Sequence, residues 1–214
     1  MRIAVCDVGL GNLRSVERAL HAATRGRRVD VEVTGDPGRV RTADRLVMPG
    51  QGAFGECARA LAGALGDAVR EHVRTGRPYL GICLGLQVLF GSSEESPGCT
   101  GLGVFEGAVV RLAGGVDEAT GGRLKIPHMG WNEAEPEAAN RGLLSGAAQH
   151  FYFVHSFVVV PRDRAIVAAT TEYGSGRSAR FVSAVSHENV FACQFHPEKS
   201  QRAGIALLER FVAS

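Results

Sequence analysis

The sequence of 214 residues predicts an α/β fold built on a mixed β-sheet, and two observations support this prediction. In the first half, short apolar runs alternate with segments whose apolar residues recur at helical spacing, which is the pattern of βαβ units and a parallel sheet. From residue 102 onward, strand-like runs follow one another with glycine-rich turns between them, which favours antiparallel strands. We therefore expect a parallel core with an antiparallel extension, and ligands at the carboxyl ends of the parallel strands.

The first half predicts four strands, at 2–7, 29–33, 45–50 and 79–83, because each is a short run rich in apolar residues. A helix with Asn12 as its N-cap follows the first strand, a second helix is expected over 58–69, and a third over 84–90. The turn at 9–15 has Arg14 where a dinucleotide-binding fingerprint needs its third glycine. We therefore interpret it as a tight βα turn.

The second half predicts strands at 103–105, 108–112, 151–160, 166–171, 179–186 and 190–195, and one last helix from about residue 201. No internal repeat is visible in the sequence. Because the length gives no reason to divide the chain, we expect a single domain over residues 1–214.

Composition and charge argue against several classes of protein. Apolar residues make up 45% and charged residues 21% of the chain, as in ordinary globular proteins. The net charge of +2 comes without a basic cluster, and no apolar run approaches the ~20 residues of a membrane span, so neither nucleic acid nor a membrane is an expected partner. Five cysteines without a C-x-x-C pair, and no secretory signal pattern, favour a cytoplasmic protein without disulfides, metal or cofactor.

The segment GICLGLQ, residues 81–87, places Cys83 between two glycines where a predicted strand meets a predicted helix. An isolated cysteine in an apolar run is usually a buried structural residue. The pattern G-x-C-x-G, however, is that of a strand-to-helix elbow that lifts a nucleophile out of the sheet, and the helix N-terminus favours the thiolate. The amides of Leu84 and of Gln51 or Gly52, in the turn PGQG, are candidate oxyanion donors.

The segment QFHPEKS, residues 194–200, offers a base for this cysteine. In an extended chain, His196 and Glu198 point to the same side with Cα atoms about 6.6 Å apart, so the carboxylate can orient the imidazole. An isolated H-P-E is more often a surface turn, but here it follows a buried-looking strand. Spacing assigns no role to His128, favours a core or supporting role for His155, and places the remaining histidines at the surface: His21, His72, His150 and His187.

Three of these segments, PGQGAFGE, GICLGLQ and FHPEKS, together resemble the triad (class I) glutamine amidotransferases. The resemblance implies a three-layer, flavodoxin-like α/β fold and an enzyme that releases ammonia from glutamine through a cysteine thioester. It implies that the catalytic triad is Cys83, His196 and Glu198. It further implies oxyanion donors at Gln51, Gly52 and Leu84, and contacts with glutamine at Gln87, His155 and Ser156.

Within that family, GLGN (9–12), KIPHMGWN (125–132), FVHSF (153–157) and the tail QFHPEKS (194–200) resemble the glutaminase subunits of imidazole glycerol phosphate synthases. Such subunits form a heterodimer with a (βα)8-barrel cyclase, which uses the ammonia to make imidazole glycerol phosphate and AICAR in histidine biosynthesis. The resemblance implies a docking face that includes Asn12, Pro127, Met129, Trp131 and Lys199. Gln51 departs from the smaller or apolar residue usual in the PGQG turn.

Three alternatives remain open at the level of sequence. The chain could donate ammonia to another synthase, although KIPHMGWN and the short tail after QFHPEKS disfavour this. It could be a non-catalytic regulator on the same scaffold, which the intact triad positions disfavour. It could also be a cysteine hydrolase that acts alone, because an elbow by itself does not select an amide substrate.

Overall fold

The computed structural model describes residues 1–113, 115–117, 120–175 and 179–214. Within these residues, eleven strands form one sheet: β1 Arg2–Cys6, β2 Asp30–Thr34, β3 Arg45–Gly50, β4 Tyr79–Cys83, β5 Gly107–Arg111, β6 His128–Pro136, β7 Gln149–His155, β8 Phe157–Pro161, β9 Val167–Glu172, β10 Arg180–His187 and β11 Val190–Cys193. The described helices are α1 Leu13–Ala23, α2 Pro37–Thr42, α3 Phe54–Ala60, α4 Ala64–Arg74, α5 Leu84–Gln87, α6 Gln201–Ala213 and the short 3₁₀ turns η1 Arg164–Ile166 and η2 Pro197–Lys199.

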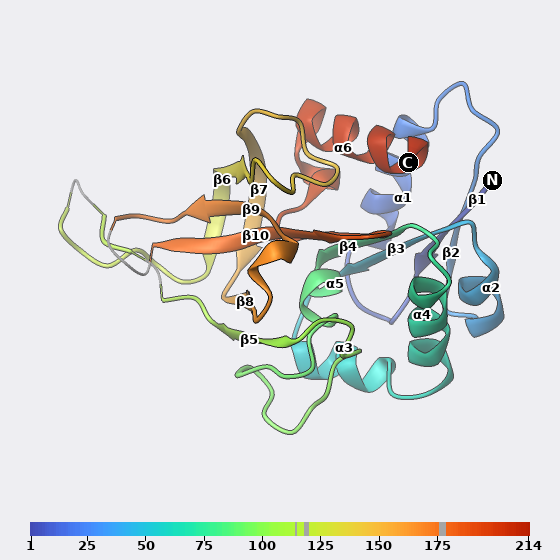
Figure 1. The fold of residues 1–214 in the computed structure, drawn as a ribbon, viewed down its shortest axis with the longest axis horizontal. Helices are drawn as coiled ribbons and strands as arrows, with labels where there is room; N and C mark the ends of the chain where they lie inside the picture. Colours follow the sequence, from blue (N-terminus) through green and yellow to red (C-terminus); the bar gives the residue numbers. More distant parts are fainter. Residues whose placement is uncertain (114, 118–119, 176–178) are drawn as a thin grey trace.

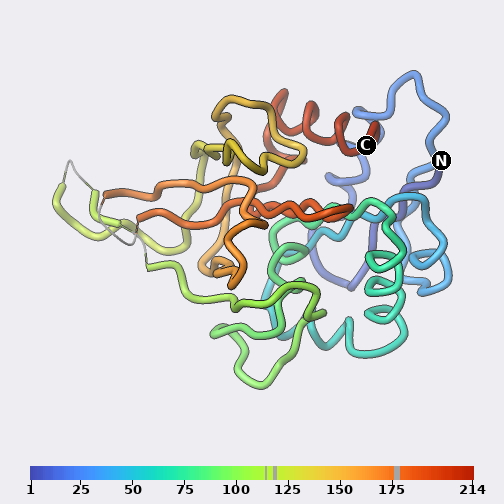
Figure 2. Tube along the Cα trace, viewed as in Figure 1, coloured from blue at the N-terminus to red at the C-terminus, as the bar shows by residue number. Residues whose placement is uncertain are grey.

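The sheet is mixed, as the sequence predicts. Strands β2, β1, β3, β4 and β11 lie side by side in parallel. Strands β10, β9, β6 and β7 continue the sheet in antiparallel pairs, while β5 pairs with β8 and β8 with β10. Figure 2 shows β9 and β10 (orange) projecting beyond the helical layers. The parallel strands therefore bring the segments after β3, β4 and β11 to one edge, where ligands bind in such sheets.

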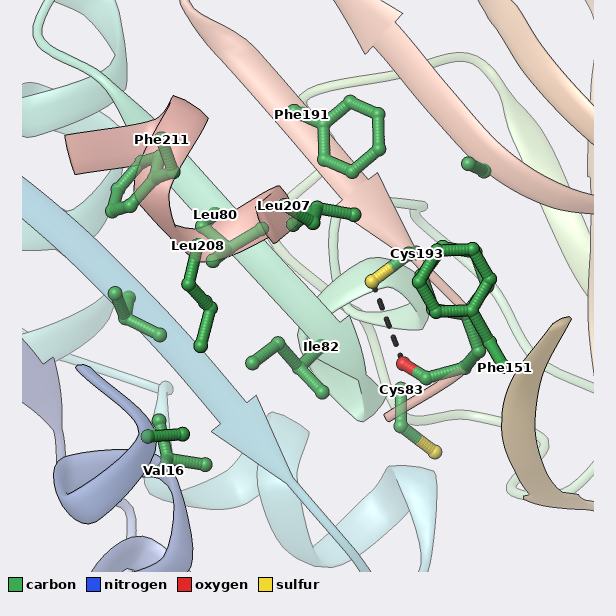
Figure 3. Packing of buried hydrophobic residues seen from close by; sticks show 14 of the residues in the cluster. Val16, Leu80, Ile82, Cys83, Phe151, Phe191, Cys193, Leu207, Leu208 and Phe211 are labelled. Carbon is green, nitrogen blue, oxygen red and sulfur yellow. Dashed lines mark hydrogen bonds between the residues drawn. The ribbon is translucent and has the colours of Figure 1, made fainter. Parts of the chain in front are cut away.

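Helices cover both faces of the parallel strands, which gives three layers (Figure 1). Alternate side chains of each strand enter two separate cores. Ile3 and Val5 of β1 pack in the core beneath α1 and α6, whereas Ala4 and Cys6 pack in the core on the side of α3 and α4. Figure 3 shows the first core, in which the side chains of β4 and α6 meet. Burial on both faces explains why the strand segments read as apolar runs.

Two predicted helices differ from those observed. The segment expected as one helix over 58–69 forms α3 and α4, which are separated at Gly63, whose φ of 135° is incompatible with a continuous helix. The helix expected over 84–90 ends at Gln87, because Phe90 pairs with Phe105 instead of continuing the helix. Asn12 caps α1 as predicted, since its side chain accepts a hydrogen bond from the Ser15 amide.

Several strand predictions also need correction. The segment 151–160 is not one strand but breaks at Ser156 into β7 and β8, which pair with different neighbours. Residues 128–136, for which no element was expected, form β6, and residues 103–105 contribute a single bridge rather than a strand.

Two further features differ from the prediction. The helix α2 was not predicted from the sequence. His72, expected at the surface, is fully buried, and its Nε2 lies 3.1 Å from the Pro78 carbonyl oxygen.

No helix in the described part of the chain is long and apolar enough to cross a membrane.

Candidate active site

Cys83 is the last residue of β4 and forms a sharp turn into α5. Its φ of 55° and ψ of −104° define a backbone conformation that residues other than glycine rarely adopt. Helix α5 begins at the next residue, so the sulfur stands beside amides of a first helical turn, which have no intrahelical partner. This is the geometry of a nucleophile elbow.

Both glycines of the G-x-C-x-G segment are required by close backbone approach. A Cβ on Gly81 would lie 2.4 Å from the carbonyl oxygen of Gly85. A Cβ on Gly85 would lie 1.8 Å from the carbonyl oxygen of Met48 in β3. Because neither distance leaves room for a side chain, the elbow can fold this tightly only with glycine at both positions.

The predicted oxyanion donors lie together beside the elbow. A Cβ on Gly50, the last residue of β3, would lie 2.6 Å from the Cβ of Leu84, so the turn after β3 packs directly against the start of α5. Gln51 and Gly52 in this turn line the same cavity as Leu84. Gly52 has a φ of 116°, which favours glycine. The turn after β3 and the start of α5 therefore both border the cavity.

His196 and Glu198 follow β11 and form a buried pair. Nδ1 of His196 lies 2.7 Å from Oε1 of Glu198, and their side chains are 1% and 3% exposed. Because the carboxylate accepts the Nδ1 proton, Nε2 faces away from it, and this buried nitrogen has no hydrogen-bond partner among the described residues. A nitrogen held in this way is available to exchange a proton with a reacting group.

The electrostatics of this pair favour a charged imidazole. Burial lowers the pKa of His196, but interactions of the ring with the Cys83 sulfur and the Glu198 carboxylate outweigh burial and raise the pKa to about 9. Burial is the main cause that raises the pKa of both Cys6 and Cys57 to about 12. Those two side chains remain neutral thiols at neutral pH, as expected for structural cysteines.

A cavity of about 250 Å³ opens beside Cys83. This volume is slightly below the lower end of the usual range for ligand pockets, about 300 to 1,000 Å³, and therefore suits a small molecule. The elbow, the turn after β3, β7 and the start of β8 supply most of its walls. The residues lining it are Gln51, Gly52, Cys83, Leu84, Gln87, Glu95, Pro127, Val154, His155, Ser156 and Phe157.

All three residues predicted to contact the substrate, Gln87, His155 and Ser156, therefore line this cavity. The ring of His155 has both nitrogens engaged: Nδ1 lies 3.0 Å from the Phe157 carbonyl oxygen, and Nε2 lies 3.1 Å from Nδ1 of His128. The ring thus shapes the cavity wall and offers no free nitrogen to a ligand.

The hydrogen-bond partners fix both histidines as neutral tautomers. The Phe157 carbonyl can only accept, so Nδ1 of His155 donates to it and Nε2 accepts from Nδ1 of His128. Nε2 of His128 then accepts from the side-chain amide of Asn132 at 3.2 Å. Burial is the main cause that lowers the pKa of His128 to about 4 and of His155 to about 3. These hydrogen bonds, from Asn132 through His128 to His155, give His128 a structural role that its position in the sequence did not reveal.

Glu95 and Gln194 also lie at the site, and the sequence did not predict either of them. The Glu95 carboxylate lines the cavity and accepts a hydrogen bond from the Phe54 amide at 2.7 Å. Its loop has no recognisable pattern. Gln194 is fully buried, and its Nε2 lies 3.4 Å from the Cys83 sulfur. The alternation that places His196 and Glu198 on one side of the chain would have placed Gln194 there too.

Met129, Trp131, Tyr152 and Lys199 form a surface that we call the β6–β7 face. The side chains of Met129 and Trp131 are 62% and 49% exposed. The ring of Trp131 packs edge-on against Tyr152, and the Lys199 ammonium lies 5.6 Å from the centre of the Tyr152 ring. The structure thus links two predicted docking residues, Trp131 and Lys199, through Tyr152, which was not predicted.

The other two predicted docking residues lie elsewhere. Pro127 lines the cavity and is itself exposed. Asn12 is exposed at the start of α1, which packs against η2, the turn that carries Lys199. The β6–β7 face is also tied to the catalytic segment, since the Tyr152 carbonyl accepts a hydrogen bond from the His196 amide at 2.9 Å.

The fold and this site have the layout of an α/β enzyme with a cysteine nucleophile. The model of the family "Glutamine amidotransferase class-I" matches residues 5–214, so the chain belongs to the class-I glutamine amidotransferases. The chain is 47% identical over 213 residues, 98% of both chains, to imidazole glycerol phosphate synthase subunit HisH of Syntrophotalea carbinolica. The protein of the same name from Aromatoleum aromaticum is 46% identical over 218 residues, which cover 99% of this chain and 97% of the relative.

Solved structures agree with this fold. The structure of PurLQS from Thermotoga maritima superposes with a TM-score of 0.72 at 16% sequence identity and covers 99% of this chain and 97% of its own. At this low identity the similarity concerns the fold alone. It confirms the predicted α/β architecture with a mixed sheet.

Proposed function

We propose that this chain is the glutaminase subunit of an imidazole glycerol phosphate synthase, which hydrolyses glutamine and passes the ammonia to a cyclase subunit. The observation that supports this most directly is the strained elbow of Cys83, which opens on a small cavity and adjoins the buried pair of His196 and Glu198. The full-length similarity to the two HisH subunits supports the choice of synthase.

In the first half-reaction, the Cys83 thiolate attacks the side-chain carbonyl carbon of glutamine, and the C–O π electrons move to the oxygen. Amides of Leu84 and of Gln51 or Gly52 stabilise this oxyanion. His196 donates its Nε2 proton to the nitrogen that leaves, the C–N bond breaks, and ammonia and a γ-glutamyl thioester result. Glu198 holds the ring so that Nε2 faces the reacting atoms.

In the second half-reaction, water replaces ammonia. His196 removes a proton from the water, the oxygen attacks the thioester carbon, and the C–S bond breaks to release glutamate and the Cys83 thiolate. The imidazolium is restored at the same time, so the pair is ready for the next turnover. The pKa of His196, about 9, keeps the ring protonated at neutral pH while it waits for substrate.

Substrate selection is assigned to polar groups around the cavity. The Glu95 carboxylate offers a negative partner for the α-ammonium group of glutamine. Gln87 offers the substrate its side-chain oxygen, Oε1, because Nε2 of Gln87 already donates to two acceptors. The small volume of the cavity favours a free amino acid over a peptide. These features argue against a general cysteine hydrolase.

We assign the β6–β7 face to docking of the (βα)8-barrel cyclase in a heterodimer. An exposed Trp and Met beside a Lys and a Tyr is the composition of an interface centre with a polar rim. In the complex, ammonia would pass directly to the cyclase, which makes imidazole glycerol phosphate and AICAR in histidine biosynthesis. A cytoplasmic location is consistent with five free thiols, because such thiols persist in reducing compartments.

The test measures glutamate formation from glutamine by the chain alone, with the cyclase subunit, and with the cyclase plus its nucleotide substrate. We expect strong stimulation by the loaded cyclase and formation of imidazole glycerol phosphate. Full activity of the chain alone would support a free-standing hydrolase. Stimulation only by another synthase would contradict the assigned pathway while leaving the glutaminase chemistry intact.

A further inference from the structure

A buried pair of glutamine side chains adjoins Cys83, and the reaction described above does not use one of them. Gln194, directly after β11, is fully buried, and its Nε2 lies 3.4 Å from the Cys83 sulfur. Its Oε1 accepts a hydrogen bond from Nε2 of Gln87 at 3.0 Å. The same Nε2 of Gln87 also donates to the Phe157 carbonyl oxygen at 3.1 Å. A continuous chain of hydrogen bonds therefore runs from a backbone carbonyl to the sulfur.

The backbone carbonyl fixes the orientation of both amides. The Phe157 oxygen can only accept, so the atom of Gln87 that faces it must be the NH₂ group. That NH₂ group also faces Gln194, which must therefore present its oxygen to Gln87. The other end of the Gln194 amide is then its NH₂ group, and this end faces the Cys83 sulfur. Flipping either amide would oppose two donors or two acceptors.

We propose that Gln194 is a positioning residue for Cys83, whose side-chain NH₂ group donates a hydrogen bond to the thiolate and holds the sulfur at the mouth of the cavity. This inference rests on the proposed glutaminase function. A neutral amide suits the task because it stabilises negative charge on sulfur and, lacking an acidic or basic centre at neutral pH, leaves the mobile proton on His196. Gln194 thus complements His196, which lies two residues further along the same segment.

The segment after β11 holds the donor in place. The backbone N–H of Gln194 donates a hydrogen bond to the Ser183 carbonyl oxygen at 2.9 Å, so the backbone at this position is tied to β10. Two residues later, the His196 amide donates to the Tyr152 carbonyl oxygen at 2.9 Å. Both side chains that act on the sulfur therefore come from one stretch of backbone that is anchored on two strands.

The variants proposed here leave the titratable side chains around Cys83 unchanged. Cys193 of β11 and His196 interact with Cys83, Glu198 pairs with His196, and Glu95 and His155 line the same cavity. Burial raises the pKa of Cys193, so this thiol stays neutral. His155 is neutral at physiological pH, because burial lowers its pKa to about 3. Any change in the pH dependence of sulfur reactivity is then attributable to the lost amide donor.

The test is alkylation of Cys83 by iodoacetamide, followed by mass spectrometry as a function of pH. Gln194→Met removes the donor and keeps the length of the side chain, and Gln194→Asn keeps the amide but withdraws it by one methylene. We expect the rate at neutral pH to fall about ten- to a hundredfold in both variants, as for loss of a hydrogen bond to a charged group. The rate should approach that of the wild type at alkaline pH. Gln201→Met, the same change at the exposed first residue of α6, should leave the profile unchanged.

Two results would overturn the proposal. One is a Gln194→Met profile that coincides with that of the wild type, and the other is an equal loss at every pH, which indicates a structural role only. Thermal unfolding of each variant identifies any that does not fold. If Gln194→Met does not fold, Gln194→Asn decides by the same two criteria, and failure of both variants to fold would likewise mark the residue as structural. Alkylation of Cys83 needs no glutamine, so the two proposals are tested by different measurements. A wild-type chain without glutaminase activity would contradict the proposed function, whatever the alkylation profiles show.

Discussion

Cys83 and His196 show how single residues are prepared for chemistry in this chain. The backbone of Cys83 is held at a φ of 55°, a conformation that costs about 1 to 3 kcal/mol and persists only where the surroundings impose it. Here the surroundings are β3 and α5, which meet at glycines. His196 is fixed by Glu198 and is charged at neutral pH because its pKa is raised to about 9.

Replacement of Glu198 by glutamine should move the alkaline limit of activity to lower pH. The carboxylate is one of the groups that raise the pKa of His196 to about 9, so its removal lowers that pKa. Because the ring must be protonated to release ammonia, kcat/KM should then decline at a lower pH than in the wild type. The measurement is a pH profile of glutaminase activity with the cyclase present. Glu209→Gln, an exposed control on α6, should not move the limit, and an unmoved limit in Glu198→Gln would contradict this role.

At the scale of elements, β6 and β7 are joined by a buried pair of histidines. His128 and His155 face each other across the two strands, and both are neutral in the folded chain. The sequence did not predict β6, because its segment mixes proline, glycine and polar residues and becomes a strand only through pairing with β7 and β9. Tertiary pairing also ends β7 at His155, because β8, which begins after Ser156, pairs with β5 and not with β6.

These histidines should make stability depend on pH. In the unfolded chain their pKa is near 6.5, whereas in the folded chain it is about 4 for His128 and about 3 for His155. Between these values the unfolded state binds more protons, so the free energy of unfolding falls as pH decreases from about 6.5 to about 4, by roughly 2 to 3 kcal/mol for His128. Urea denaturation at several pH values measures this fall.

The variant His128→Gln, which cannot titrate, should reduce the slope of stability against pH in this range. His21→Gln, at an exposed position on α1, serves as the matched control and should leave the slope as it is. An unchanged slope in His128→Gln would show that His128 is not held neutral by the fold.

At the scale of the whole molecule, the site exists because parallel strands bring distant segments to one edge. Cys83 and Gln194 are 111 positions apart, yet their side chains touch. The alternation of strands and helices predicted this edge, and local patterns predicted Cys83, His196 and Glu198 as candidates. Glu95 could not be predicted in this way, because its loop has no pattern and only the folded chain places it at the cavity.

Docking of the cyclase should depend on the β6–β7 face. Trp131→Ala removes an exposed aromatic side chain, and the Kd for the cyclase should rise by about tenfold or more, as for an interface hot spot. Val160→Ala removes an exposed apolar side chain on β8, at 48% exposure, and should leave the Kd unchanged. Isothermal titration calorimetry of both variants measures the effect. An equal change in both, or none in Trp131→Ala, would place the interface elsewhere.

The most direct test of the central claim compares two nitrogen sources in the reconstituted complex. The complex with Cys83→Ala is supplied with either glutamine or ammonium salts, and formation of imidazole glycerol phosphate is measured, with Cys99→Ala as a control at a half-exposed cysteine. We predict that Cys83→Ala abolishes the glutamine-dependent reaction and keeps the ammonia-dependent one. Equal loss of both reactions in an intact complex, or retention of both, would contradict the assignment of Cys83 as the glutaminase nucleophile.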